Sequence, residues 1–160
     1  MNHRNLIDAL ELSGEIFEQF VRRIPEGQLN RNRGEGFWTV YEHVHHLALV
    51  QPLMFKRIQQ FKNEDQPVIH PFNPTGGESK KSSKIRPVED YLESFKSWRV
   101  KQVELARSCD ESVWDKTGVH PEYDLYSFDI LLRHMLSHDG WHMYRMEELW
   151  IAKDEVLTKM

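Results

Sequence analysis

A histidine-rich segment near the C-terminal end of the chain has the residue types and spacing to bind a metal ion. His134, His138 and His142 recur there at intervals of four residues. Side chains four apart on a helix lie on one face, so two such imidazoles can reach a single ion. Each step of four residues turns the side-chain direction by about 40°, so the three histidines do not point equally well at one centre.

The apolar residues of the same segment indicate which histidines point inward. At about 100° per residue, His142 projects about 35° from the centre of the apolar face, His138 about 75° and His134 about 115°. We therefore expect His138 and His142 to face the core and His134 to lie at its rim. Asp139 projects close to the middle of this face. A buried carboxylate needs a partner, which an imidazole N–H or a metal ion would provide.

A second group of histidines, at positions 43, 45 and 46, lies much earlier in the chain. His43 and His46 fall within the apolar arc of their segment, whereas His45 points the other way. Periodicity alone does not separate His43 from His46 as a ligand. A single inward histidine is more often a hydrogen-bonded core residue than a ligand, but two inward groups on separate helices favour a metal site.

The elements that position these residues are predicted to be helices. Apolar residues recur at helical spacing in four segments, at about 3–24, 40–62, 87–109 and 127–152. Thr39 followed by Glu42 forms a capping box at the start of the second segment, and Ser127 is a suitable cap for the fourth. No convincing strand pattern appears. We expect an all-α protein, a four-helix bundle that forms one domain over residues 1–160.

Residues 63–86 are rich in proline, glycine, serine and lysine and are predicted to form a long loop. The simpler interpretation is a solvated excursion of the chain. The alternative is a lid over a site.

Composition excludes several classes of protein. The chain has 160 residues, of which 29% are charged and 39% hydrophobic, as in an ordinary globular domain. Its net charge of −4 does not favour nucleic-acid binding, and no apolar stretch approaches the roughly 18 residues of a membrane span. We see no signal peptide, and the single cysteine, Cys109, rules out a disulfide within the chain. A cytoplasmic location is therefore expected.

Several short motifs resemble the DinB/YfiT-like superfamily. The segment Trp38-Thr-Val-Tyr-Glu-His-Val-His-His-Leu47 is similar to that family's second-helix signature, and His138-Asp-Gly-Trp-His142 to the ligand pair on its last helix. The segment that begins at His120 resembles a His-Pro-Glu motif ahead of that helix. The resemblance implies a four-helix bundle, frequent homodimers and a divalent metal ion on three histidines. By position these are His138, His142 and the histidine directly before the leucine, His46 rather than His43.

Such a site favours catalysis. Three imidazoles around zinc or nickel leave coordination positions open, whereas a structural site normally has four protein ligands. The resemblance implies a metal-dependent enzyme that transfers a low-molecular-weight thiol to an electrophile or hydrolyses a small substrate. Asp139 is a candidate for orienting a ligand, with a hydrogen bond in the core as its simpler interpretation. His120 is a candidate acid, base or substrate contact. His120 also has the simpler interpretation of a surface loop residue.

Two other functions remain open at this point. In the first, the metal ion only stabilises the bundle or is sensed by it, and no reaction occurs. In the second, no metal binds, and the bundle is an interaction protein with a dimer face formed by Trp141, Met143, Met146 and Trp150.

Overall fold

Four long helices make up most of the computed structural model, which describes residues 3–70 and 86–157. They are α1 (His3–Arg23), α2 (Val40–Asn63), α3 (Val88–Arg107) and α4 (Phe128–Ile151). Their bounds lie close to those predicted from the hydrophobic periodicity. The predicted all-α four-helix bundle is confirmed.

The two helices that carry the histidines begin at side-chain caps. The Glu42 backbone N–H donates to Thr39 Oγ1 at 3.1 Å, and the Thr39 backbone N–H donates to the Glu42 carboxylate at 2.7 Å, which completes the predicted capping box of α2. In α4, Ser127 Oγ accepts a hydrogen bond from the Ile130 N–H at 3.3 Å. These caps fix where each helix starts, and therefore which residues face the interior.

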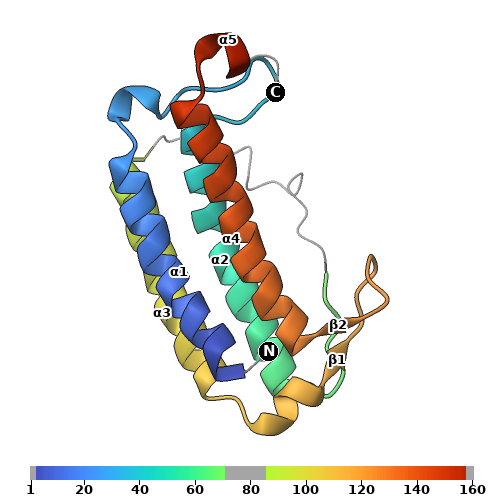
Figure 1. The fold of residues 1–160 in the computed structure, drawn as a ribbon. Coiled ribbons are helices and arrows are strands. Elements are labelled where there is room, and N and C mark those ends of the chain that lie inside the picture. The colour runs from blue at the N-terminus through green and yellow to red at the C-terminus, as the bar shows by residue number, and fades with distance from the viewer. Residues whose placement is uncertain (1–2, 71–85, 158–160) are drawn as a thin grey trace.

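The helices are not arranged in simple chain order. Figure 1 shows α1 and α4 running in one direction and α2 and α3 in the other. The packed pairs are α1 with α3 and α4, and α2 with α3 and α4, so α1 lies diagonally opposite α2. The helices α2 and α4 are thus antiparallel neighbours, and their histidines can meet across one interface.

Two hydrophobic clusters fill the bundle, and a buried polar layer separates them. One cluster includes Leu10 and Leu131, and the other includes Phe17 and Met146. In every helix the polar residues fall between the positions that belong to the two clusters; they are Ser13, Gln51, Arg99, Gln102 and Asp139. The core is therefore interrupted at the level where α4 passes from its N-terminal to its C-terminal half.

Hydrogen bonds connect this polar layer across all four helices. Arg99 donates to the Asp139 carboxylate at 2.7 Å, to Ser13 Oγ at 3.1 Å and to Gln51 Oε1 at 3.3 Å. Gln102 donates to the same Gln51 oxygen at 3.0 Å. Buried polar groups that are paired in this way avoid much of the cost of losing water.

The expectation that strands are absent is wrong. Two short strands, β1 (Thr117–Gly118) and β2 (Tyr126–Ser127), pair antiparallel ahead of α4, and Val68 forms a parallel bridge with Val119. Strands of two residues are too short to show an alternating pattern, so periodicity could not reveal them. The backbone of residue 118 lies so close to that of Pro67 that only glycine fits there. A Cβ on Gly118 would lie 2.9 Å from the Pro67 carbonyl oxygen.

The described residues also form three short helices outside the four long ones: the 3-10 helices η1 (Glu26–Gln28) and η2 (Glu111–Asp115), and α5 (Asp154–Leu157). The predicted loop over 63–86 falls partly on described residues, and of these 64–70 are non-helical. Its remainder, 71–85, lies outside the described residues, so the predicted alternative of a lid also falls outside them. In the part of the chain that the structure covers, none of the helices has the length and apolar character needed to cross a membrane.

Candidate metal centre

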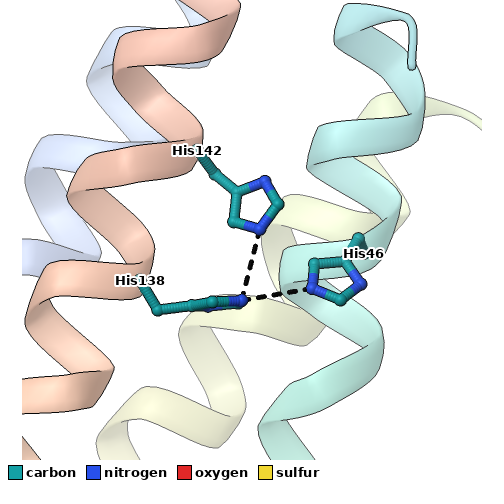
Figure 2. Close-up of side chains that lie close together, drawn as sticks. All are labelled: His46, His138 and His142. Atoms are coloured by element: carbon teal, nitrogen blue, oxygen red, sulfur yellow. Dashed lines mark hydrogen bonds between the residues drawn. The ribbon is translucent and has the colours of Figure 1, made fainter. Parts of the chain in front are cut away.

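Three histidines from two neighbouring helices point at one another. Figure 2 shows His46 on α2 facing His138 and His142 on α4. His138 and His142 lie one helical turn apart, as their spacing predicted, and the antiparallel packing of α2 brings His46 opposite them. The structure therefore brings together the three residues that the resemblance selected.

The distances suit a single ion. Nε2 of His138 lies 3.2 Å from Nε2 of His46 and 3.2 Å from Nε2 of His142. One ligand atom from each of the three residues lies within 4.8 Å of the others. Nitrogens held about 2.0–2.1 Å from one tetrahedral zinc ion would lie about 3.3 Å apart. The donor set and its spacing thus fit a metal ion of that size.

The environment keeps the three imidazoles neutral. Burial, together with repulsion from neighbouring imidazoles, lowers the pKa of His46 to about 4 and that of His142 to about 2. Burial and then the nearby Arg99 charge lower the pKa of His138. Neutral imidazole is the form that binds a metal, so protons do not compete strongly for these nitrogens near pH 7.

His43, the alternative to His46 as a metal ligand, lies outside the three-histidine group and contacts His142 instead. Its Nδ1 lies 2.7 Å from Nδ1 of His142, on the opposite side of that ring from the three-histidine group. Only one of the two Nδ1 atoms can carry the shared proton. A metal ion on Nε2 of His142 requires the proton on Nδ1 of His142, which then donates to His43. His43 is therefore placed to orient a ligand, the position that carboxylates or carbonyls usually occupy in metal sites.

Asp139 pairs with an arginine rather than with an imidazole. Its carboxylate accepts from Arg99 at 2.7 Å and lies 3.4 Å from Ser13 Oγ, and its side chain is 2% exposed. The expectation that an imidazole N–H or a metal ion would serve as its partner is wrong. Arg99 comes from α3 and enters the core at the level of Asp139, which periodicity within α4 cannot reveal.

Two cavities adjoin the three histidines, and His138 lines both. The first, of about 480 Å³, is also lined by His43, His142, Trp141 and Arg145. The second, of about 390 Å³, is lined by His46, Arg57, His120, Tyr126 and His134, among others. His120 and the rim residue His134 thus lie at the edge of the centre and not within the three-histidine group.

Sequence reasoning missed two residues at the site. The Trp38 ring lies over the histidines, with its centroid 5.0 Å from that of His46 and 5.8 Å from that of His142. Trp38 directly precedes the cap of α2, a position where a large apolar residue commonly packs back on its helix. Arg57 follows His46 by eleven residues, about three helical turns, and this spacing could have placed it on the same face.

Comparison with known proteins gives consistent matches. Residues 9–146 match the family model of the DinB superfamily. The sequence is 30% identical over 109 residues, 68% of this chain, to the "Putative metal-dependent hydrolase" of Geobacillus thermodenitrificans (strain NG80-2), and the match spans 57% of that relative. It is 24% identical over 144 residues, 89% of this chain and 81% of the relative, to the "Putative metal-dependent hydrolase YfiT" of Bacillus subtilis (strain 168).

The fold also matches a solved structure. The structure of YfiT from Bacillus subtilis, described as having an unusual four-helix bundle topology, superposes with a TM-score of 0.79. The sequence identity is 23%, and the match covers 92% of this chain and 85% of that one. At this level of identity the likeness shows a shared fold.

Proposed function

The chain belongs to the DinB superfamily, and on this premise we propose that it is a divalent-metal-dependent enzyme that hydrolyses a small substrate. The observation that carries the proposal is the set of three neutral imidazoles, from His46, His138 and His142, spaced for one ion beside two cavities. The names of the relatives as metal-dependent hydrolases support the same reaction class.

The residues of the chain divide the work as follows. The three histidines hold the ion by three nitrogens, which leaves coordination positions for other ligands, and imidazole suits zinc or nickel. A bound divalent ion supplies Lewis acidity and lowers the pKa of water to about 7. His43 holds the proton arrangement of His142, and Trp38 covers one side of the group.

Transfer of a low-molecular-weight thiol to an electrophile is the second candidate reaction. Such a transfer needs room for two reactants beside the ion, and the two cavities that meet at His138 supply it. An assay with and without added thiol distinguishes the two reactions, because hydrolysis proceeds without thiol and thiol transfer does not.

We further propose a cytoplasmic homodimer. The single cysteine suits a reducing compartment. Of the four residues considered as a dimer face, Met146 is buried in the core, and Met143 and Trp150 pack against the same cluster. These three side chains are therefore not free to form an interface together. Trp141 and Tyr144 on α4 are 55% and 58% exposed and are the surface residues on which to test dimer formation.

Elemental analysis of tag-free protein tests the proposed function first. We expect about one divalent metal ion per chain in the wild type and loss of metal in His46→Ala and His138→Ala. His45→Ala is the matched control, because this neighbouring histidine contacts the Tyr91 ring, with the ring centroids 4.9 Å apart, and lies outside the group. A panel of small esters and amides, assayed with and without thiol, then identifies the reaction. Turnover that persists in metal-free protein would contradict the proposal.

A further inference from the structure

Two arginines of the described chain are buried, and they differ in their partners. Arg99 is 3% exposed and pairs with Asp139 at 2.7 Å. Arg57 is 8% exposed, and among residues 3–70 and 86–157 no carboxylate lies within salt-bridge distance of it. A buried charge without a counter-charge is unfavourable, so Arg57, unlike Arg99, is placed to take an anionic partner.

The contacts of Arg57 use only part of its guanidinium. Nη2 donates to the His70 carbonyl oxygen at 2.7 Å, and Nη1 lies 3.9 Å from the sulfur of Met54. The guanidinium also interacts with the neutral Tyr126 hydroxyl on the wall of the same cavity. Nε is buried and has no hydrogen-bond partner among the described residues. A guanidinium offers five N–H donors in a plane that matches a carboxylate, and here neutral atoms meet only some of them.

Arg57 lines the cavity of about 390 Å³ that also contacts His46 and His138. Aromatic rings form another part of its wall: the centroids of His120 and Tyr126 lie 4.7 Å apart, and those of Tyr126 and His134 lie 5.6 Å apart. This cavity therefore combines one buried cation, flat apolar surfaces and direct contact with the candidate metal ligands.

His120 adds a neutral donor to the cavity. Its Nδ1 accepts a hydrogen bond from the Glu122 backbone N–H at 3.1 Å, which places the ring proton on Nε2. Burial chiefly, with a contribution from Arg57, lowers the pKa of His120, and burial likewise lowers that of His134. Both rings are thus neutral near pH 7, and Arg57 is left as the one full positive charge among the cavity residues.

We propose that this cavity binds a carboxylate group of the substrate, with Arg57 as the counter-ion, and so selects small carboxylic acids with an apolar or ring-shaped body. The proposal rests on the proposed function and names the substrate class of the same site. One positive charge, with the acidic Glu122 also in the lining, matches a monoanion better than a doubly charged phosphate.

Benzoate and its neutral analogue benzamide test the proposal on the full chain. Binding is measured by titration calorimetry with EDTA-treated protein, so that a metal ion does not contribute to carboxylate binding. We expect the wild type to bind benzoate at least tenfold more tightly than benzamide. Arg57→Gln should abolish this difference, and Arg57→Lys should keep part of it. Lys56→Gln is the matched control, because it removes the same charge from the adjacent, exposed position and should leave the preference unchanged.

A second measurement on the wild type does not depend on the folding of any variant. Benzoate should shift the imidazole NMR signals of His120 and His134 but not those of His45, which lies outside the cavity. Equal binding of benzoate and benzamide, a preference retained in Arg57→Gln, unshifted His120 and His134 signals, or tighter binding of inorganic phosphate than of benzoate would each overturn the proposal. Because no metal is present, these results are independent of the elemental analysis that decides the metal site.

Discussion

Nδ1 of His43 lies 2.7 Å from Nδ1 of His142, so one imidazole of α2 directly orients an imidazole of α4. His43 lies three residues before His46, and α2 therefore contributes both a candidate ligand and a partner for another ligand. Removing the partner should weaken metal binding without removing a donor atom from the ion.

We predict that His43→Ala lowers metal affinity by about 10–100-fold, and that the site can still be filled at a high metal concentration. The reason is that the proton on Nδ1 of His142 loses its acceptor, so the ring is free to rotate or to place the proton on Nε2. Competition with a chromophoric chelator measures the affinity. His45→Ala should leave it unchanged, and an unaltered affinity in His43→Ala would refute the orienting role.

Metal binding should stabilise the folded chain. Zinc at about a thousand times its Kd should raise the free energy of unfolding by about 4 kcal/mol, because the ion binds the assembled site and not the separated helices. Urea unfolding with and without zinc measures the gain. His138→Ala should eliminate it, whereas His134→Ala, one turn away on α4 and outside the group, should retain it.

Without metal, stability should depend on pH. Burial lowers the pKa of His43 and His46 to about 4 and that of His142 to about 2, below the unfolded value of 6.5. The unfolded chain therefore binds more protons than the folded chain below pH 6.5. Stability should be full above about pH 6.5 and should fall from there to pH 4, by at most about 1.4 kcal/mol per pH unit for each histidine.

Urea unfolding of EDTA-treated protein between pH 4 and 8 checks this dependence. His142→Gln should reduce the slope below pH 6.5, because one of the groups that takes up a proton on unfolding is gone. A slope that is the same in the wild type and in the variant would show that His142 is not held neutral by the fold.

Breaking the buried ion pair should be costly. Asp139→Ala leaves the Arg99 charge in the core without its partner and should lower the free energy of unfolding by about 3–5 kcal/mol. The double variant Arg99→Met, Asp139→Leu should be considerably more stable than Asp139→Ala. On the same helix, Asp129→Ala removes a more exposed pair with Arg133 and should cost less than about 1 kcal/mol. If Asp139→Ala unfolds no more easily than Asp129→Ala, the Arg99–Asp139 pair does not stabilise the core as a buried ion pair.

The helices could be predicted because each has an apolar face, and because α2 and α4 also begin at side-chain caps, Thr39 with Glu42 and Ser127. The choice between His43 and His46 could not be made from periodicity. Three residues turn a helix by about 300°, so both side chains fall within one broad apolar arc. Only the position of α4 across the interface decides which ring joins His138 and which contacts His142.

Contacts between distant segments were also beyond the sequence. Periodicity showed that Asp139 is buried, but not that its partner would come from α3. The spacing of Arg57 from His46 could place it on the same helix face, but nothing in the sequence indicates that it lacks a counter-charge. Its significance follows from the absence of a carboxylate within salt-bridge distance of it in the described chain, and from the cavity that it lines.

The helices that face each other across the candidate centre are the second and the fourth, and His46 and His138 stand 92 positions apart. During synthesis, therefore, the first histidine leaves the ribosome long before the other two exist. A metal ion cannot be captured by a partly made chain in the way that a local motif captures one, and joining such distant positions carries an entropic cost that other contacts must meet first. The bundle should therefore assemble before any metal ion can bind all three histidines at once.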